Sequence, residues 1–566
     1  MKATTIGAVP AYVNALIAFL TLVGGSADAG DLTGGVVAAD QVFASHCGAE
    51  ILDRGGNAAD AAVATALCAG VVQPAGSGLG GGGFAIWVDP TQAGADVIDF
   101  REVAPGAATR DMYLGEDGAP IPHLSDKGAR SVAVPSESRG LAALLHAHGS
   151  LSFRAVAAPA ISLASKGFRV GGHLAESLAR ETARDVLAEF QVDGHTAKAG
   201  DLVRRPALAT TLKRWASTSG EDLATGRSAQ AIVARVAADG GVLTAADLAS
   251  YQVLHREAVQ VKFKGYTVIT MPAPSSGGIA LAQMLRVLDD VDLRSIQWQS
   301  PAYLHLLAEV MKHAYADRAH RLGDPAFVDV PQDELLSDGR IDAIRAAIDP
   351  ERTLDPSAYG SVVTPLDDHG TQHISVLDAS GRAVALTTTI NTAFGAELIA
   401  PGTGVVLNDE MDDFGIAPGV PNAFGLLTGE ENAIAPGKRP LSSMSPTVVL
   451  DEDGRVVMVI GASGGGQIIS STLQVLLNVL VFGQSPERAL EAPRIHHQWQ
   501  PNELVVEPGF PADVRDALTA LGHKVVERTL FSAVQVVSVD EDGNVDAGSD
   551  PRKGGRPAFS EETRSR

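Results

Sequence analysis

Hydroxyl side chains gather at one end of a predicted β-hairpin. Residues 371–377 and 382–390 alternate in the manner of strands, and the segment between them has the composition of a tight turn. Counting back from the turn places Thr371 opposite Thr388 and within one residue of Thr389. A threonine hydroxyl becomes a nucleophile when a base removes its proton. The hairpin therefore holds a candidate nucleophile, although threonine is also common in strands for reasons of packing alone.

A glycine-rich turn supplies a second chemical feature. The apolar run 456–460 predicts a strand, Gly461–Gly466 predicts a turn, and residues 468–481 have helical spacing. This order of strand, glycines and helix leaves free backbone N–H groups that can stabilise an oxyanion. The turn lacks the Gly-Lys-Ser/Thr ending of a phosphate-binding loop, so a phosphate ligand is not expected.

The same turn supports a rival nucleophile. Gly461, Ser463 and Gly465 have the spacing of the nucleophile elbow of α/β-hydrolases, in the correct strand–turn–helix context. A serine enzyme of that kind needs an acid and a histidine later in the chain, and Asp513 and His523 are candidates. The residues alone leave Thr371 and Ser463 as competitors.

The elements that must position these groups begin near the N-terminus. Apolar spacing predicts helices over 42–53 and 58–72, and the glycine run Gly76–Gly83 then leads into a strand over 85–88. The run contains the spacing G-x-G-x-x-G, but the dinucleotide fingerprint requires strand, glycines and helix in that order. Here a helix precedes the glycines and a strand follows them. We therefore interpret the glycines as points of close backbone approach.

Three further segments show no chemistry of their own. Residues 155–250 and 302–320 have helical spacing and are interpreted as packing elements. The connector 355–370 is polar and turn-rich, as ordinary surface loops are.

Composition limits the function classes. The chain of 566 residues is 45% hydrophobic with a net charge of −23, which is typical of a globular protein and unlike a nucleic-acid binder. A short apolar run followed by Ala27-Asp28-Ala29 predicts a secretory signal peptide over residues 1–29. No later segment has the ~20 apolar residues of a membrane span, so we expect a periplasmic or secreted protein with no stable membrane span. In that location Cys47 and Cys68 could form a disulfide, which their spacing does not decide.

A series of motifs runs through the chain in a fixed order. They are GGNAADA (55–61), SGLGGGGF (77–84), REVAP (101–105), GTQHISV (370–376), NDEMDDF (408–414), RPLSSMSP (439–446), GG (464–465) and PRIHHQW (493–499). Together they resemble the gamma-glutamyltransferase (glutathione hydrolase) family of N-terminal-nucleophile hydrolases, from about Gly35 to Gly555.

The resemblance implies a fold and a maturation step. The fold would be a mixed α/β (α+β), four-layer αββα sandwich, formed jointly by two subunits. Family members cut themselves before a threonine, here at Gly370–Thr371, which implies a heterodimer of a large subunit, 30–370, and a small subunit, 371–566. The freed α-amine of Thr371, with a reference pKa of roughly 7.7 to 8.0, would be the base. Thr389 resembles the family's second threonine, which orients the nucleophile.

The resemblance also implies the substrate site, for a small γ-glutamyl compound such as glutathione and an amino acid or dipeptide acceptor. The implied ligands of the substrate's α-carboxylate are Arg101, Ser442 and Ser443; those of its α-ammonium are Asp413, Asn391 and Glu410; those of the oxyanion are the N–H groups of Gly464 and Gly465. No cofactor and no metal is implied, and His496 and His497 lack a third ligand at suitable spacing, so we interpret them as structural.

Two positions depart from the family pattern. Gln372 replaces the Thr or Ser often found after the nucleophile, which bears on the processing rate. Phe424 stands in the loop 413–440, which resembles the family's lid, where a tyrosine is common.

Other functions remain open at this stage. They are a glutaryl or cephalosporin acylase of the same superfamily, a Ser463 hydrolase, and an exported binding protein without activity. Arg101 with Asp413 argues against the acylase, because a glutaryl group has no ammonium for Asp413 to bind.

Overall fold

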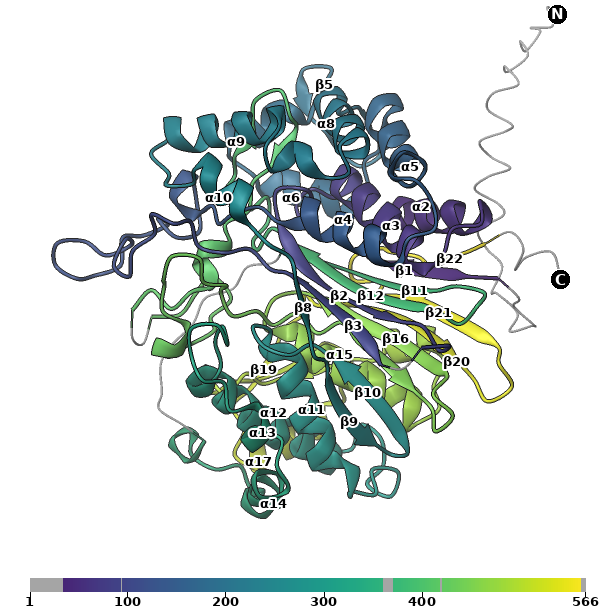
Figure 1. Cartoon of the computed structure of the whole chain (residues 1–566). Coiled ribbons are helices and arrows are strands. Elements are labelled where there is room, and N and C mark those ends of the chain that lie inside the picture. Colours follow the sequence, from purple (N-terminus) through teal and green to yellow (C-terminus); the bar gives the residue numbers. More distant parts are fainter. Residues whose placement is uncertain (1–33, 93, 360–369, 418–419, 561–566) are drawn as a thin grey trace, which may run out of the picture.

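Two stacked antiparallel β-sheets form the centre of the molecule, and helices cover the outer face of each (Figure 1). The structure is a computed structural model that describes residues 34–92, 94–359, 370–417 and 420–560. The predicted signal peptide and residues 360–369 of the connector lie outside the described residues. The layers follow the order helix, sheet, sheet, helix, so the predicted four-layer αββα fold is confirmed.

The first sheet has seven strands in the order β22-β1-β11-β12-β2-β3-β8. Its strands are β1 (Val36–Ala39), β2 (Gly82–Val88), β3 (Ala95–Phe100), β8 (Leu254–Arg256), β11 (Gln372–Leu377), β12 (Ala383–Thr389) and β22 (Ala558–Phe559). Its outer face is covered by α2 (Val42–Asp53), α3 (Ala58–Val72) and α4 (Glu137–His148). The hairpin β11–β12 therefore lies in the middle of a sheet and is buried on both faces.

The second sheet has six strands in the order β21-β20-β16-β15-β10-β9. Its strands are β9 (Val259–Phe263), β10 (Tyr266–Thr270), β15 (Thr447–Leu450), β16 (Val456–Ser463), β20 (Ala533–Val539) and β21 (Val545–Ser549). It is covered by α11 (Ser276–Asp289) and α15 (Gln467–Leu480), and α12 (Pro301–Arg321) packs on α11. Strand β16 contacts β11 and β12 of the first sheet, which brings the glycine turn towards the hairpin.

The remaining elements lie outside the two sheets. The helices are α5 (Phe153–Lys166), α6 (Gly172–Arg180), α7 (Arg184–Glu189), α8 (Pro206–Ser217), α9 (Arg227–Ala238), α10 (Ala245–Ser250), α13 (Gln332–Leu335), α14 (Asp338–Ala347), α16 (Pro486–Glu491) and α17 (Ala512–Ala520). The short strands are β4 (Phe168–Arg169), β5 (Gln191–Val192), β6 (His195–Thr196), β7 (Leu202–Val203), β13 (Ile399–Ala400), β14 (Val405–Val406), β17 (Ile495–His496), β18 (Leu504–Val506) and β19 (Val525–Glu527).

Helices α2 and α3 begin and end where the sequence predicts. Asn57 caps α3, since its side chain accepts from the N–H of Asp60 while the Asp60 carboxylate accepts from the N–H of Asn57. Cys47 of α2 and Cys68 of α3 form a disulfide, which joins the two helices.

The glycine run before β2 allows close backbone contact, as expected. A Cβ on Gly80 would lie 2.0 Å from the Val406 carbonyl oxygen, and one on Gly81 would lie 1.9 Å from that of Thr389. Both distances are shorter than any real Cβ contact, so larger residues are excluded. These glycines place the loop directly beside the end of β12.

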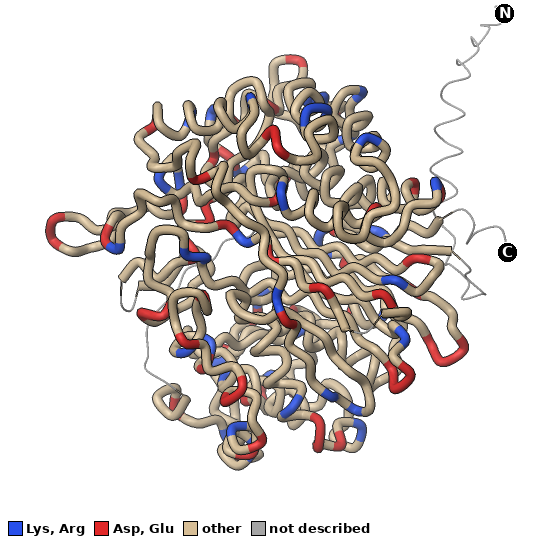
Figure 2. The backbone as a smooth tube through the Cα atoms, in the orientation of Figure 1, with Lys and Arg blue, Asp and Glu red and all other residues tan. Residues whose placement is uncertain are grey.

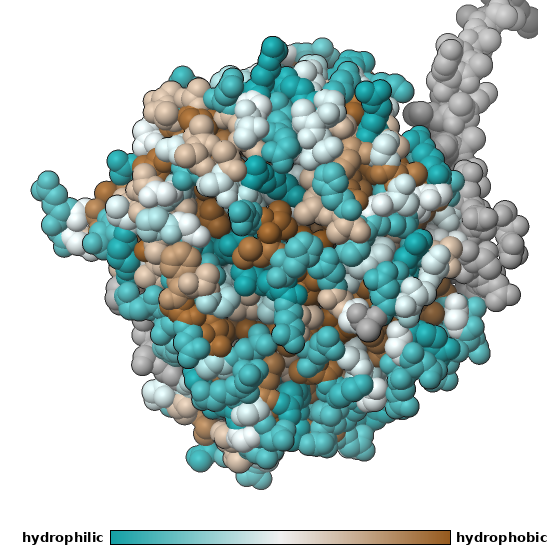
Figure 3. All heavy atoms as spheres, in the orientation of Figure 1, coloured by the Kyte–Doolittle hydropathy of each residue, from teal (hydrophilic) through white to brown (hydrophobic). Residues whose placement is uncertain are grey.

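The surface carries mixed charge. On the face shown in Figure 2, Lys and Arg are scattered among Asp and Glu instead of gathering in one patch. Figure 3 shows hydrophilic residues over most of this face, with small hydrophobic groups between them. Among the described residues, no helix combines the length and the apolar character needed to cross a membrane.

We expect Glu137 to make stability fall as pH rises. This fully buried carboxyl accepts only a 3.3 Å bond from the Gly78 N–H, and burial raises its pKa to about 8. Between its ordinary pKa and that value the folded state holds a proton that the unfolded state releases, so unfolding becomes easier with rising pH. Glu137→Gln lacks this proton and should not lose stability in the same way. Its free energy of unfolding, relative to that of wild type, should therefore increase by on the order of 2–4 kcal/mol between pH 5 and pH 8. Thermal melts of both proteins across this range measure the difference, and parallel curves would contradict it.

Candidate active site

The hairpin that carries Thr371 forms as predicted, with a register one residue away from the sequence count. Gln372 pairs with Thr388, so Thr371 lies across from Thr389. The difference arises because the turn closes at Arg382, one residue later than counted. The Oγ1 atoms of Thr371 and Thr389 are 3.0 Å apart.

The main chain at Thr371 is strained. Its φ angle is 118°, a region that β-branched residues rarely adopt. Its N–H donates to the Gly76 carbonyl at 3.0 Å. A Cβ on Gly370 would lie 1.9 Å from the Asn391 carbonyl oxygen, so only glycine fits before Thr371. The Gly370–Thr371 bond is therefore held in an unfavourable conformation by its surroundings.

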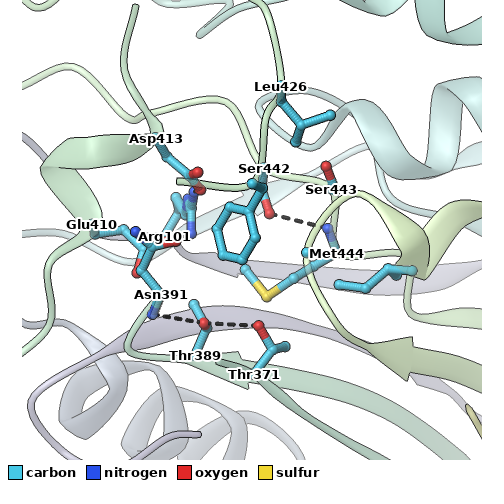
Figure 4. Close-up of a pocket in the computed structure, with 13 residues that line it drawn as sticks. Arg101, Thr371, Thr389, Asn391, Glu410, Asp413, Leu426, Ser442, Ser443 and Met444 are labelled. Carbon is cyan, nitrogen blue, oxygen red and sulfur yellow. Dashed lines mark hydrogen bonds and ion pairs between the residues drawn. The ribbon is translucent and has the colours of Figure 1, made fainter. Parts of the chain in front are cut away.

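Thr389 is fixed by a second contact. Its Oγ1 accepts from the N–H of Asn391 at 2.9 Å and also shares a hydrogen bond with the Thr371 hydroxyl (Figure 4). The two threonine hydroxyls and Asn391 thus form a short chain of hydrogen bonds at the pocket floor.

The predicted glycine turn lies at the end of β16, which extends to Ser463 and so is longer than the sequence indicated. Gly464 and Gly465 have φ angles of 119° and 55°, which favour glycine at both positions. A Cβ on Gly465 would lie 2.3 Å from the ring of Phe424, so the ring lies directly against this turn.

All predicted site residues except Gly464 line one pocket (Figure 4). The pocket is lined by Arg101, Thr371, Thr389, Asn391, Glu410, Asp413, Phe424, Leu426, Ser442, Ser443, Met444, Gly465 and Ile468. Leu426, Met444 and Ile468 had no signal in the sequence beyond apolar character, and they supply an apolar wall.

Arg101 lies among carboxyl groups at one side of the pocket. Its guanidinium donates to Glu410 and Asp413, and its Nε donates to the Pro440 carbonyl at 3.2 Å. A third carboxyl, that of Glu102, lies 3.8 Å away. The Arg101 and Glu410 side chains are 1% exposed and that of Asp413 is 11% exposed, so Asp413 is the carboxylate most open to a cationic ligand.

One buried cation cannot balance three buried anions. Burial lowers the pKa of Arg101, but the surrounding Glu410, Asp413 and Glu102 outweigh it, so the pKa rises and the guanidinium stays charged. Burial raises the pKa of Glu410 to about 8 and that of Glu102 well above its ordinary range. Both shifts favour the protonated carboxyls, which leaves the Arg101 cation and the Asp413 carboxylate as one pair of opposite charges at the side of the pocket.

Phe424 belongs to the segment 422–425, here called the cover, which is hydrogen-bonded to Asp413. Asn422 donates to Asp413 Oδ1 at 2.7 Å and accepts from the Phe424 N–H at 3.1 Å. Gln498 donates to the Gly425 carbonyl at 3.2 Å from the other side. The position of the Phe424 ring thus depends on Asp413.

Helix α12 contributes more than packing, which corrects our interpretation of residues 302–320. Arg318 is buried and donates to Ser443 Oγ at 3.4 Å and to Ser276 Oγ at 2.9 Å. Burial lowers its pKa to about 10, so it remains a cation at neutral pH. Sequence reasoning missed it because a helical arginine is usually a solvated surface charge.

Comparison with known proteins decides the family. The Gamma-glutamyltranspeptidase family model matches residues 44–560. This chain belongs to the gamma-glutamyltranspeptidase family. Similar relatives are the glutathione hydrolase proenzymes of Escherichia coli K12, 38% identical (92% of this chain, 90% of the relative), and Bacillus subtilis 168, 37% identical (92% and 90%).

Solved structures support the same grouping. The cephalosporin acylase of Bacillus halodurans has a TM-score of 0.81 at 27% identity, covering 93% of this chain and 96% of that chain. The Helicobacter pylori gamma-glutamyltranspeptidase has a TM-score of 0.54 at 36% identity, covering 56% of this chain and 93% of that chain. The acylase shares the fold, but the higher sequence identities are to the gamma-glutamyltranspeptidase family.

The rival nucleophile, Ser463, does not have the hydrogen-bond partners of a catalytic serine in this chain. Ser463 Oγ bonds to Asp40 at 2.6 Å and receives a bond from Lys553 at 2.7 Å. The candidate His523 bonds to His305 instead, and Asp513 lies in the first turn of α17. No histidine is bonded to Ser463 among the described residues, so the nucleophile-elbow hypothesis is wrong.

Histidines elsewhere have structural partners. His496 bonds to Ser470 Oγ at 2.7 Å, and His497 accepts from the Trp499 N–H at 3.1 Å. His305, Glu309 and His523 bring three possible metal-ligating atoms within 4.8 Å of one another. However, Lys312 donates to Glu309 there, and its ammonium opposes a second cation in the same space.

Proposed function

We propose that this protein hydrolyses and transfers the γ-glutamyl group of glutathione and related compounds through an acyl-enzyme on Thr371. The observation that carries the proposal is the 3.0 Å contact of Thr371 with Thr389 at the floor of a pocket walled by Arg101 and Asp413. The relatives named glutathione hydrolase support the substrate class.

The first step is self-cleavage. The Thr371 hydroxyl attacks the Gly370 carbonyl carbon, the C–N bond breaks, and the hydroxyl proton passes to the departing amine. Water then hydrolyses the resulting ester, which leaves a carboxylate on Gly370 and a free α-amine on Thr371. Cleavage also removes the φ constraint on Thr371, so the strain at 118° favours it. The products are subunits 30–370 and 371–566, which stay together as a heterodimer.

Two comparisons support this maturation. The relatives from Escherichia coli and Bacillus subtilis are named proenzymes. The Helicobacter pylori chain is covered to 93% by only 56% of this chain, in keeping with a mature enzyme of two chains.

In turnover the α-amine takes the proton of the Thr371 hydroxyl, whose oxygen attacks the γ-carbonyl carbon. The N–H groups of Gly464 and Gly465 stabilise the oxyanion, and Thr389 orients the nucleophile. The proton passes to the leaving amine, and the acyl group remains as an ester on Thr371. Water or the amino group of an acceptor then releases it.

Charge fixes the orientation of the substrate. Arg101 binds the α-carboxylate together with the hydroxyls of Ser442 and Ser443. Asp413, supported by Glu410 and Asn391, binds the α-ammonium. A glutaryl group has no ammonium, so an acylase function would leave Asp413 without a ligand.

The proposal also includes export of the protein. The predicted signal peptide over 1–29 would direct the protein to the periplasm or outside the cell, where the Cys47–Cys68 disulfide is stable.

A denaturing gel and two anilides test the function. The purified protein should run as two fragments, the smaller beginning Thr-Gln-His-Ile-Ser, and should turn over γ-glutamyl anilide. A single intact chain contradicts the maturation, and equal turnover of glutaryl anilide favours the acylase.

The side chain of Phe424 in the cover should affect how the acyl group divides between water and an acceptor amine. Phe424 excludes water by apolar contact alone, so we expect this enzyme to favour hydrolysis. In Phe424→Tyr a hydroxyl could hold the cover shut, raising the transfer-to-hydrolysis ratio by roughly two- to tenfold, the equivalent of one hydrogen bond. Product partitioning at a fixed dipeptide concentration measures it. Phe424→Leu is the control, with an unchanged or lower ratio, and a tyrosine variant that behaves likewise refutes the idea.

A further inference from the structure

A lysine from the C-terminal part of the chain lies directly behind the nucleophile. Lys553 is in the turn after β21, and its Nζ donates to the Thr371 carbonyl at 3.0 Å, to Ser463 Oγ at 2.7 Å and to Asp40 Oδ2 at 3.4 Å. Its side chain is 7% exposed. An ammonium has three N–H donors, and here each has an acceptor.

The three acceptors belong to three different strand ends. Thr371 directly precedes β11, Asp40 directly follows β1, and Ser463 is the last residue of β16, next to Gly464. The ammonium therefore ties the main chain of Thr371 to the glycine turn that is proposed to bind the oxyanion. A displacement of ~1 Å between such groups costs on the order of 100-fold in rate.

The charges behind Thr371 are few. Asp40 and His173 line the same rear pocket as Lys553. Burial, with a smaller contribution from Lys553, lowers the pKa of His173 to about 4, so this ring is neutral at neutral pH. Burial raises the pKa of Asp40, whereas Lys553 and Ser463 act in the opposite direction. Among the described hydrogen bonds Asp40 has none to Thr371, whereas the Lys553 ammonium donates directly to its carbonyl.

On the substrate side the ionisable groups of the pocket lining are Arg101, Glu410 and Asp413, and Arg318 donates to Ser443 Oγ of the same lining. The charges of the substrate would meet these groups. Lys553 contacts Thr371 from outside this lining, in the rear pocket.

We propose that Lys553 is a positioning residue for Thr371, whose ammonium fixes the nucleophile's main chain against the oxyanion turn and whose charge keeps the freed α-amine unprotonated. A like charge disfavours the protonated amine and so lowers its pKa. The inference rests on the self-cleavage proposed above, which creates that amine.

The test is Lys553→Met, which keeps length and apolar bulk and removes the charge and the donors. In cleaved enzyme we expect kcat to fall on the order of 10- to 100-fold, with KM within about twofold because the substrate's ligands are intact. Without the cation the amine pKa rises, so the acid limb of kcat/KM should move to higher pH by roughly half to one unit. Loss of self-cleavage in this variant, when wild type cleaves, also supports the proposal, because the same hydroxyl must be positioned.

Two controls separate positioning from folding. Lys553→Arg keeps the charge and should restore the acid limb and part of kcat. Lys312→Met removes another buried lysine, which is paired with Glu309 and is not part of the pocket lining, and should leave the pH profile unchanged. The proposal is overturned if Lys553→Met shows wild-type kcat and acid limb, or if Lys312→Met shifts the limb equally. The gel tests self-cleavage of the wild type, and the kcat and pH profiles of the variants test the role of Lys553. The two proposals can therefore be refuted independently.

Discussion

Thr371→Ala is expected to remain a single chain and to lose activity by at least about 10⁴-fold. The alanine has neither the hydroxyl that attacks the Gly370 carbonyl nor the oxygen that would carry the acyl group. Among the described residues the Thr371 side chain makes one hydrogen bond, to Thr389, so its removal should leave the fold unaffected. A denaturing gel, turnover of γ-glutamyl anilide and a thermal melt measure the three outcomes.

Thr371→Ser is the matched control, because it keeps the hydroxyl and removes only the methyl group. It should still cleave, at a lower rate, and retain measurable turnover. An alanine variant that cleaves, or that turns over the anilide at more than a small fraction of the wild-type rate, would show that the nucleophile lies elsewhere.

Asp413→Asn is expected to lower kcat/KM for a γ-glutamyl anilide by roughly 30- to 1000-fold, about 2–4 kcal/mol of binding free energy. The asparagine has almost the same shape, so the bond from Asn422 and the cover can persist. What it loses is the negative charge that would meet the substrate ammonium at a nearly buried site. Most of the loss should appear in KM, and self-cleavage should proceed, since the carboxylate does not touch the scissile bond.

Arg101→Met should give a loss of similar size, and Glu102→Gln is the control for both variants. Glu102 lies beside Arg101 but does not line the pocket, and burial raises its pKa well above the ordinary range, which favours the neutral form that glutamine resembles. The activity of Glu102→Gln should stay within about threefold of that of wild type. Wild-type-like turnover by both Asp413→Asn and Arg101→Met would refute the proposed orientation of the substrate.

Several local features were predictable from sequence because short-range forces decide them. The bounds of α2 and α3 agree with the structure, since apolar spacing and the Asn57 cap define them. The order of strand, glycine turn and helix around Gly464 also agrees. The hairpin was located correctly, but its register was one residue off, because a single extra residue in the turn is not visible in composition.

The site itself was reached through family resemblance, and only the tertiary structure brings it together. Arg101 meets Glu410 and Asp413 because the two sheets stack and place distant segments around one pocket. Ser463 shows the limit of local pattern: its spacing fits a catalytic serine, yet packing gives it Lys553 and Asp40 as partners. Sequence alone determined which groups could be nucleophiles, because side-chain chemistry and turn geometry are local. Contacts between strand ends hundreds of residues apart decide which of these groups, Thr371 or Ser463, faces the pocket. A local sequence pattern contains no information on the energies of such contacts.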